Sequence, residues 1–565
     1  MQNSKVVAII QARMSSSRLP GKIMADIEGH PMLFHIIERA RRIMGIDDLV
    51  IATTTQRSDD LVEQWAKTNG VNVFRGSEED VLKRYFDTAL KYNADVVVRI
   101  CADSPLFDPE LTGKMIVALV ENRGDYIALE KNQPSANSGV NVLSFTALKE
   151  AHEKASAGYQ REHVVPYFIE CPRKFKYVYV SQNPAFARSD FRLSVDTASD
   201  LELIREIYKH LHKKSAIIDL KKVIKFLDKN PAVKKINAHV VSIGGQRPGF
   251  KILIIVAASQ KVGYGHLFRM LTLAKTLTER FANSVEFLIE GDHFAKNFIL
   301  KKHFLLITTS HKTLQDYISP KFTAVIIDSH ENKLNKIFSG ISTRILRVSY
   351  DDEQNGEFAD INFMPFGSKY KKVHKGFKYL ILGNKFDKLD KKKRQYLLIS
   401  AGAADSNNCT LKIAQILLNR KAHLPLALLI GPFHKHKKKL ENFKKNFPHV
   451  KVFEKANLNV VFSQTRMAIC YFGVTMFEMI SWGIICAVFS INPRQSKEIK
   501  FFKKSILSDL GPINSKNFKT NVDEFLNNKN AQLKIRENVM RISITNGDYR
   551  VAKIIQGTLL KGFKG

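Results

Sequence analysis

A polar segment with three cationic side chains follows the first apolar run of the chain, Val6–Ile10. Arg13, Arg18 and Lys22 stand among small residues in the segment Gln11–Lys22. A loop of this kind at the carboxyl end of a strand offers backbone N–H groups and positive charge to an anion. The segment therefore predicts a polyphosphate-binding loop. Taken alone, it also fits a basic surface loop.

Two aspartates stand where β-rich runs end. Asp103 follows the run Val96–Ile100, and Asp196 follows a second β-rich run later in the chain. A carboxylate just past a buried strand contributes little to core packing and is well placed to hold Mg²⁺ against phosphates. Helical stretches follow both residues, so helix N-capping is the alternative. We predict that Asp103 and Asp196 bind Mg²⁺.

A histidine in the second half of the chain has a similar setting. The apolar run Lys251–Val256 precedes the segment Gly263-Tyr264-Gly265-His266, and the helical stretch Met270–Leu277 follows it. Glycines let the backbone of such a loop approach a ligand closely. We predict that His266 is catalytic, while a structural histidine is the alternative.

Small residues before a helix mark a second anion site near residue 473. Gly473 and Thr475 suit a diphosphate at a helix N-terminus. Glu478, one turn further, is placed to accept hydrogen bonds from ribose hydroxyls, and an ordinary helix carboxylate is the alternative. Gln495 follows a strand beside the same site. We predict that these four residues bind a nucleotide.

Alternating strands and helices must position these residues. Short β-branched runs alternate with amphipathic stretches over the first 210 residues, which is typical of a parallel sheet with crossover helices. The expected strands are Val6–Ile10, Leu49–Ala52, Val71–Phe74, Val96–Ile100, Tyr126–Ala128 and Lys176–Val180. The expected helices are Met32–Ile43, Asp59–Asn69, Asp80–Tyr92, Pro109–Val120 and Ala198–His210.

The alternation of strands and helices restarts twice, which predicts three α/β parts. We expect a first domain over residues 1–240, a linker over 241–250, a first lobe over 251–390, and a second lobe with a helical tail over 391–565. Glycine and proline enrich the linker.

Composition excludes several classes of protein. With 44% hydrophobic and 25% charged residues, the 565-residue chain has the balance of a soluble globular protein. Five scattered cysteines without CxxC spacing predict neither a disulfide framework nor a cysteine zinc site. The longest apolar run, Met479–Ile491, has 13 residues, fewer than the roughly 20 that span a membrane. Without a signal peptide at the N-terminus, we expect a cytoplasmic protein.

The net charge of +34 is concentrated in the second half of the chain. Residues 1–250 hold 36 basic and 30 acidic side chains, whereas residues 251–565 hold 52 and 24. The lysines are dispersed and lack an RNA-type aromatic motif, so we expect a solvated surface that favours anions and no nucleic-acid partner. Contact with an anionic membrane surface stays open, and we also expect a homodimer formed through the N-terminal domain.

Five ordered motifs give residues 1–239 a resemblance to a known family. They are QARxxSxRLPGK at Gln11–Lys22, FRGSEEDVLxRY at Phe74–Tyr85, RIxxDxPLxDP at Arg99–Pro109, REHV at Arg161–Val164 and LSVDTxxDL at Leu193–Leu201. This part resembles nucleotide-sugar cytidylyltransferases, above all the SpsF-type spore-coat-polysaccharide branch, which is similar to CMP-Kdo and CMP-sialate synthetases.

The resemblance implies a Rossmann-like three-layer α/β/α nucleotidyltransferase fold and transfer of CMP from CTP to a sugar-like hydroxyl with Mg²⁺. Asp103 and Asp196 would hold the metal, and Arg13 and Lys22 would act catalytically on the triphosphate. The implied nucleotide-binding residues are Gln11, Arg13, Arg18, Lys22 and Arg161. Arg161 and His163 would line the acceptor side, or else play a structural role at a helix start.

One segment departs from the pattern of this branch. A stretch of the form GLDVE is expected where the chain has Gly139-Val140-Asn141-Val142-Leu143. Two carboxylates are therefore missing. The departure bears on the acceptor more than on nucleotidyl transfer, because the phosphate and metal positions are intact.

Residues 251 to about 500 resemble the PseG-type hydrolase of pseudaminic acid biosynthesis. That enzyme removes UDP from UDP-2,4-diacetamido-2,4,6-trideoxy-β-L-altropyranose, with a two-lobed glycosyltransferase-B fold. The resemblance rests on GxGHxxR at residues 263–269, on a GGxD-like segment at 402–405 and on a GGxTxxE-like segment at 472–478. Three positions depart from the pattern: Ala403, Phe472 and Arg466.

Together the two resemblances imply a bifunctional enzyme of bacterial surface-glycan biosynthesis, making a pseudaminate-like nonulosonate. UDP-sugar hydrolysis would accompany CMP transfer. Two alternatives remain for the second half: a glycosyltransferase, or a non-catalytic nucleotide-sugar-binding module.

Overall fold

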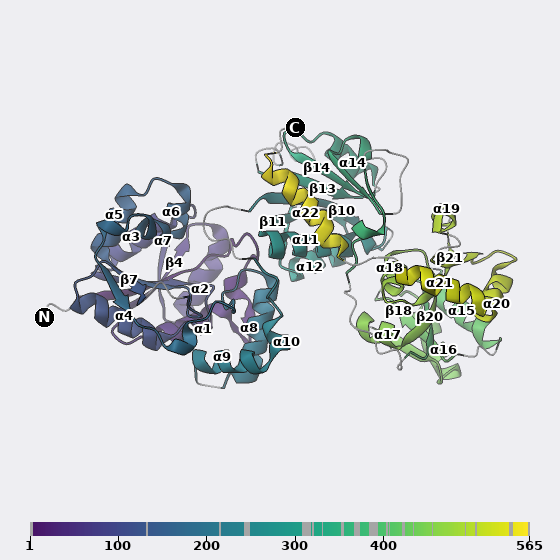
Figure 1. Ribbon diagram of the computed structural model, residues 1–565, viewed down its shortest axis with the longest axis horizontal. Helices are drawn as coiled ribbons and strands as arrows, with labels where there is room; N and C mark the ends of the chain where they lie inside the picture. The colour runs from purple at the N-terminus through teal and green to yellow at the C-terminus, as the bar shows by residue number, and fades with distance from the viewer. Residues whose placement is uncertain are drawn as a thin grey trace. The chain divides into compact units, whose positions relative to one another are not determined.

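Two compact units make up the chain, the first formed mainly by residues up to 250 and the second mainly by residues from 251 on (Figure 1). The computed structural model describes residues 4–130, 134–213, 216–241, 249–260, 262–307, 318, 321–329, 331–351, 355–365, 373–383, 394–402, 405, 407–420, 424–432, 434–454, 456–491, 493–502, 506–541 and 546–562. Most of the expected linker and the expected boundary at 390/391 therefore lie outside the described residues.

The first unit is built on a seven-stranded sheet with the order β5-β4-β1-β6-β8-β7-β9. Its strands are β1 (Val6–Gln11), β4 (Asp48–Thr54), β5 (Asn72–Gly76), β6 (Val96–Cys101), β7 (Tyr126–Leu129), β8 (Val140–Ser144) and β9 (Tyr177–Val180), beside a small ribbon of β2 (Asp26–Ile27) and β3 (His30–Pro31). Its helices are α1 (Met32–Ala40), α2 (Asp60–Thr68), α3 (Val81–Lys91), α4 (Pro109–Glu121), α5 (Phe145–Lys154), α6 (Gly158–His163), α7 (Val165–Glu170), α8 (Ala198–Leu211), α9 (Leu220–Lys229) and α10 (Pro231–Lys234).

The sheet is mixed, which corrects the expectation of a purely parallel one. β1 pairs in parallel with both β4 and β6, but β8 runs antiparallel to β6 and to β7. A parallel pairing needs a long crossover connection. The chain between β7 and β8 is too short for one, so β8 folds back beside β7. The sequence pattern correctly predicted the six expected strands, but it did not predict β8.

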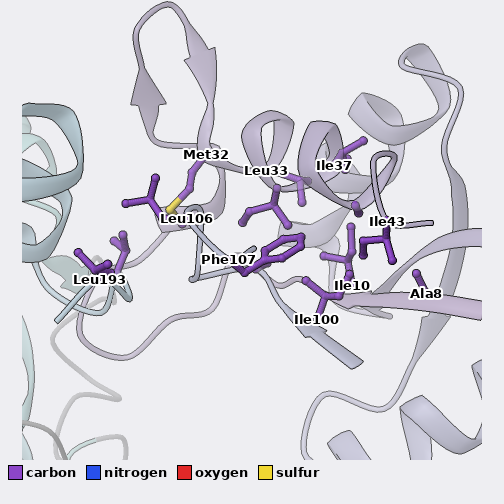
Figure 2. Close-up of a cluster of buried hydrophobic side chains, with 14 of the residues drawn as sticks. Ala8, Ile10, Met32, Leu33, Ile37, Ile43, Ile100, Leu106, Phe107 and Leu193 are labelled. Atoms are coloured by element: carbon purple, nitrogen blue, oxygen red, sulfur yellow. The ribbon is translucent and has the colours of Figure 1, made fainter. Parts of the chain in front are cut away.

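Alternating residues of the central strands face two apolar layers. Val6, Ala8 and Ile10 of β1 belong to the core beneath α1, whereas Val7 and Ile9 belong to the core on the other face. Figure 2 shows the first of these cores, with residues of α1 packed over β1 and β6. Helices therefore cover both faces of the sheet, as in a three-layer α/β/α domain.

A buried histidine in α1 gives the first unit a pH-dependent stability. Burial lowers the pKa of His35 to about 4 from an ordinary 6.5, and its Nε2–H donates to the Ile27 carbonyl at 2.9 Å. Between these two pH values the unfolded chain binds a proton that the folded chain excludes. The free energy of unfolding should therefore fall by up to about 3 kcal/mol as pH falls through this window.

Native-state hydrogen exchange of the α1 amides in the full chain measures this effect. His35→Gln keeps an N–H donor for Ile27 and cannot titrate. We expect protection of α1 to drop between pH 6.5 and 4.5 in the wild type, and to drop much less in His35→Gln. Equal pH dependence in both proteins would assign the loss to other groups.

The second unit contains two further sheets. The first has the order β12-β11-β10-β13-β14-β15-β16, and the second has the order β19-β18-β17-β20-β21-β22. The elements of the first are β10 (Lys251–Ala258), α11 (Gly265–Phe281), β11 (Ser284–Gly291), α12 (His293–Lys301), β12 (Leu305–Ile307), β13 (Ala324–Asp328), α14 (Asn332–Ser339), β14 (Leu346–Tyr350), β15 (Ile361–Met364) and β16 (His374–Lys375).

All neighbouring strands of the second of these sheets are parallel. Its elements are β17 (Tyr396–Ser400), α15 (Cys409–Leu418), β18 (Leu426–Ile430), α16 (Lys437–Asn446), β19 (Lys451–Glu454), α17 (Leu458–Gln464), β20 (Thr465–Tyr471), α18 (Val474–Ser481), β21 (Ile485–Ser490), α19 (Pro493–Phe502), β22 (Ser508–Pro512), α20 (Phe518–Asn527) and α21 (Lys529–Arg541). The apolar run 479–491 forms the end of α18 and β21, as expected for a buried helix and strand.

The last helix, α22 (Gly547–Leu560), packs with the first lobe of the second unit. Thr276 of α11 donates a hydrogen bond to Asp548, and Arg550 donates to the Lys378 carbonyl at 3.0 Å (Figure 1, yellow helix beside α11). The sequence analysis had assigned this helix, as a tail, to the second lobe over residues 391–565. Two Rossmann-like lobes whose final helix returns to the first form a glycosyltransferase-B-like unit.

Among the residues that the structure describes, no helix has both the length and the apolar character needed to cross a bilayer. This agrees with the interpretation of the 479–491 run.

Candidate active sites

Two loops of the first unit emerge side by side at the carboxyl edge of its sheet. β1 and β6 are parallel neighbours, and Gln11 at the end of β1 pairs in register with Cys101 at the end of β6. Each loop is anchored by side chains buried in the core. Leu19 holds the loop after β1, and Leu106 and Phe107 hold the loop after β6. Loops tied down in this way keep their polar residues in fixed positions.

Lys22 joins the two aspartates that the sequence singled out. Its Nζ lies 3.2 Å from Asp103 Oδ2 and 3.0 Å from Asp196 Oδ1, and it donates to the Val195 carbonyl at 2.7 Å. Burial opposes the charge on Lys22, but Asp196 and Asp103 outweigh it and raise the pKa of its ammonium. Asp103 and Asp196 thus converge on one cation.

Three cationic side chains surround the Asp196 carboxylate. Arg18 Nη2 lies 3.0 Å and Arg192 Nη2 lies 2.5 Å from its Oδ2. Burial alone would raise the pKa of this carboxyl, but Lys22, Arg18 and Arg192 hold it well below its usual range. Asp103 and Asp200 also pair with Lys22 and Arg192, so the three cations face three carboxylates. Arg18 Nη1 is buried without a hydrogen-bond partner among the described residues, which leaves one donor for an anionic ligand.

Neither aspartate caps a helix, so the alternative interpretation of both is wrong. The N-cap of α4 is Asp108, whose side chain accepts from the Glu110 N–H at 3.0 Å. The N-cap of α8 is Thr197, which forms a capping box with Asp200. Asp103 and Asp196 are therefore held at the sheet edge without a capping role.

The other residues predicted in this domain surround the loop after β1. Arg13 Nη1 donates to the Glu78 carbonyl at 3.1 Å, and Gln11 has a buried Oε1 without a hydrogen-bond partner in the described chain. Arg161 lies 2.7 Å from Asp80, the N-cap of α3, which ties α6 to α3. His163 ends α6 and is exposed.

In the second unit, His266 lies in the first turn of α11, which begins at Gly265, five residues before the expected start at Met270. Its Nδ1 is 2.7 Å from Asp328 Oδ1, at the carboxyl end of β13. Because an ionised carboxylate can only accept, Nδ1–H donates to Asp328 and the lone pair of a neutral His266 ring lies on Nε2.

Arg269 fixes the carboxylate that orients His266. Its Nε and Nη2 each lie 2.5 Å from Asp328, and its Nη1 donates to Asp351 at 2.8 Å. Burial alone would raise the pKa of Asp328, but Arg269 and His266 hold it well below its usual range. Burial raises the pKa of Asp351 despite Arg269. Asp328 is therefore an ionised, fully buried partner for His266.

The second lobe brings two of the predicted glycine segments together. Gly402 follows β17 and Gly473 follows the parallel neighbour β20. A Cβ at either glycine would lie within 2.9 Å of the Tyr471 ring, and Gly402 has a φ of +82°. Only glycine therefore fits at Gly402, and the two backbones meet at one edge across the Tyr471 ring.

The remaining residues predicted in this lobe occupy the same edge. Gln495 Nε2 donates to the Phe472 carbonyl at 3.3 Å, and its Oε1 accepts from the Ile491 N–H at 3.1 Å. Thr475 is half-buried and Glu478 is buried, both in α18. Gln495 thus ties the end of β20 to the end of β21.

Two of the departures from the hydrolase pattern can be located. The Phe472 side chain is buried in the core of the lobe, 5.8 Å from the Phe477 ring centroid. Arg466 is exposed near the start of β20, at the opposite end of that strand from Gly473. Ala403 lies outside the described residues. Arg466 therefore does not bear on the glycine edge.

Comparisons with known proteins identify the first unit. A family model described as cytidylyltransferase matches residues 7–228. The Bacillus subtilis spore coat polysaccharide biosynthesis protein SpsF is 31% identical over 230 residues, which cover 40% of this chain and 95% of SpsF. The chain belongs to the cytidylyltransferase family.

Two further relatives match the chain, one over 236 residues and the other over 119 residues. The Methanocaldococcus jannaschii protein MJ1063 is 38% identical over 236 residues, which cover 42% of this chain and 96% of that protein. The 3-deoxy-manno-octulosonate cytidylyltransferase of Geobacter sulfurreducens is 34% identical over 119 residues, covering 21% of this chain and 46% of the enzyme. Residues 7–228 thus form a cytidylyltransferase-family domain, and the unit with two further α/β sheets follows it.

Two site residues were missed by sequence reasoning. Arg84 in α3 of the cytidylyltransferase domain is fully buried, and its Nε and Nη2 have no partner among the described residues. Burial lowers its pKa to about 10. Asp328 lies in none of the motifs that the sequence analysis singled out. A single charge within an otherwise apolar strand or helix face is the signal that would have found both.

The residues that the structure describes contain no group of three or more His, Cys, Asp and Glu side chains with metal-site geometry. Asp103 and Asp196 form a pair only. Such a pair is what Mg²⁺ commonly uses together with substrate phosphates.

Proposed function

We propose that the cytidylyltransferase domain transfers CMP from CTP to the hydroxyl of an acidic sugar in the presence of Mg²⁺. The observation that carries the proposal is the convergence of Asp103 and Asp196 on the Lys22 ammonium. Two carboxylates that share one cation can share another, and the neighbouring Arg18 has a buried Nη1 that is free to donate to a polyphosphate.

In this proposal, the cationic residues of the domain bind the triphosphate and the acidic residues bind the metal ion. Arg13, Arg18 and Lys22 bind the triphosphate, and Asp103 and Asp196 hold Mg²⁺ by carboxylate oxygens. The ion, when bound, neutralises charge on the phosphates. Lys22 then moves from the two carboxylates toward the phosphate oxygens that the loop after β1 cradles. Catalysis consists mainly of alignment and charge neutralisation.

In the proposed reaction, one bond forms and one bond breaks at the α-phosphorus of CTP. The hydroxyl oxygen of the acceptor forms a bond to the α-phosphorus of CTP, and its proton passes to solvent. The bond from that phosphorus to the oxygen bridging to the β-phosphate breaks. Pyrophosphate leaves with the electron pair, and CMP is joined to the sugar.

Incubation of the full chain with CTP, Mg²⁺ and a panel of ulosonic acids and sugar phosphates tests this function. The panel includes 3-deoxy-manno-octulosonate, the sugar in the name of one relative. Mass spectrometry should show one CMP conjugate, formed with release of pyrophosphate and absent when EDTA removes Mg²⁺. If no member of the panel is converted and CTP does not bind, the proposal fails.

For the second unit we propose hydrolysis of a UDP-linked amino sugar. The His266–Asp328 pair supports it, because a buried carboxylate at Nδ1 orients the imidazole and stabilises the imidazolium that forms when Nε2 takes a proton. His266 Nε2 would take a proton from water as the water oxygen bonds to the anomeric carbon and the bond to UDP breaks. The Gly402 and Gly473 segments, Thr475, Glu478 and Gln495 would bind UDP.

Release of UDP from UDP-2,4-diacetamido-2,4,6-trideoxy-altropyranose distinguishes the three hypotheses for this unit: hydrolase, glycosyltransferase and binding module. A hydrolase releases UDP in buffer alone. A glycosyltransferase releases it only when an acceptor sugar or lipid is added. A binding module retains the nucleotide sugar intact. We expect the first outcome.

We propose that the chain acts in surface-glycan biosynthesis and makes a CMP-activated, pseudaminate-like sugar. The support is the name of the relative SpsF, which acts in spore coat polysaccharide biosynthesis, and the two-lobed unit that follows the cytidylyltransferase domain.

A further inference from the structure

Arg99 is a largely buried cation without an anionic partner in the described chain. It lies in β6, four residues before Asp103, and its Nη1 donates to Asn141 Oδ1 at 3.0 Å. The buried Nε has no hydrogen-bond partner. The guanidinium also lies 5.7 Å from the ring centroid of Tyr85. A neutral amide and an aromatic ring are thus the contacts that hold this charge.

The amide of Asn141 is oriented toward Arg99 by a second bond. Asn141 of β8 is the cross-strand partner of Arg99, and its Nδ2 donates to the Tyr126 hydroxyl at 3.1 Å. The carboxamide oxygen must then face the guanidinium. Asn141 is also the position at which the sequence pattern led us to expect an aspartate. With asparagine there, the protein leaves the charge of Arg99 uncompensated.

A buried charge without an ionic partner costs free energy, so its persistence calls for a compensating group. Asp103 attracts Arg99 electrostatically and helps to raise its pKa, but its carboxylate forms an ion pair with Lys22 and none with Arg99 in the described chain. Buried polar atoms left without partners are uncommon in folded proteins. Arg99 lies opposite Ile9, two residues before the end of β6, and Gln11 Oε1 at the end of the adjacent β1 also lacks a partner among the described residues.

We propose that Arg99 and Asn141 form a subsite for the carboxylate of the acceptor. This inference rests on the proposed CMP transfer. Arg18 and Lys22 belong to the loop after β1, and Asn141 belongs to β8, on the opposite side of β6 from β1. The subsite is therefore one strand beyond the triphosphate cations, where the attacking sugar must approach. Residue 141 then sets specificity, because an aspartate there would neutralise Arg99 from within the protein.

Isothermal titration of the full chain tests the subsite without turnover. The protein is first saturated with Mg²⁺ and the α,β-methylene analogue of CTP, which cannot release pyrophosphate. The probes are 3-deoxy-manno-octulosonate and N-acetylneuraminate, each compared with its uncharged methyl ester. At least one acid should bind the wild type about tenfold or more tightly than its ester, as expected for a charge-assisted contact.

Three variants locate the effect. Arg99→Gln and Asn141→Asp should each weaken binding of that acid by about tenfold or more, while the affinity for the CTP analogue changes less than about threefold. Asn141→Asp leaves the Arg99 side chain in place, so the melting temperature of this variant should not fall. It therefore tests the subsite even if Arg99→Gln fails to fold. Arg173→Gln removes an exposed arginine of the same domain and should change nothing.

Each contrary outcome has a distinct meaning. Equal binding of acid and ester, equal binding by Arg99→Gln and the wild type, or no binding of either acid to the wild type would overturn the subsite and leave CMP transfer standing. Loss of affinity for the CTP analogue in Arg99→Gln would assign the anion to a phosphate and overturn the acceptor assignment. Failure of the wild type to bind the analogue with Mg²⁺ would instead refute the proposed function.

Discussion

Asp103→Asn is expected to lower the Mg²⁺-dependent release of pyrophosphate from CTP by about three orders of magnitude. The substitution keeps the size and hydrogen-bonding shape of the side chain and removes the negative charge that faces Asp196 across Lys22. One carboxylate cannot hold the ion against three phosphates as two can. Steady-state assays with the acceptor found in the panel measure the loss.

Asp87→Asn is the matched control, because Asp87 lies on the exposed face of α3 and pairs with Lys83. It should leave the rate unchanged. Asp196→Asn should match Asp103→Asn in direction, but its stability needs a separate measurement because three cations surround Asp196. Full activity of a folded Asp103→Asn protein would overturn the metal assignment.

In the second unit, Asp328→Asn is expected to slow UDP release by roughly two to four orders of magnitude, the range seen when the carboxylate behind a catalytic histidine is neutralised. Asparagine can present N–H to His266 Nδ1, which would place the ring proton on Nε2 and remove the base. The loss should appear in kcat more than in KM, since Asp328 does not contact the sugar.

His266→Gln separates this effect from misfolding, because it leaves the Asp328–Arg269 pair in place. It should abolish UDP release with little change in melting temperature. Asp360→Asn, which breaks the ion pair between Arg347 and Asp360 in the same lobe, is the control and should retain activity. If Asp328→Asn keeps the wild-type rate, His266 works without this partner and the proposed mechanism is wrong.

Strand positions in the first unit followed from local pattern wherever a strand is buried on both faces. Val6–Ile10 is an apolar run and Val96–Ile100 is interrupted only by Arg99, and both strands were located within one residue of their ends. β8 is different, because its polar Asn141 and Ser144 break the pattern and its pairing with β6 is antiparallel. Its place depends on the turn that precedes it and not on its own composition.

Site residues divide in the same way. Arg18, Lys22 and Asp103 were found because each follows a strand in a motif. Asp196 was found in a motif as well, but the expected β-rich run before it was wrong, since residues 191–195 form no strand. Their convergence follows from the parallel pairing of β1 with β6, which no local pattern contains. Asp328 was not found, because its function comes from a histidine sixty-two residues away in sequence.

The amino-acid sequence alone determined the family of the first domain, the α/β character of all three parts and the residue types of the phosphate loop. These depend on hydrophobic periodicity and on motifs within short segments. Only the tertiary structure decided which charges are compensated. Lys22 is shared by two carboxylates, Arg269 binds Asp328, and Arg99 contacts the Asn141 amide and the Tyr85 ring. Charge compensation depends on distances between segments that folding brings together.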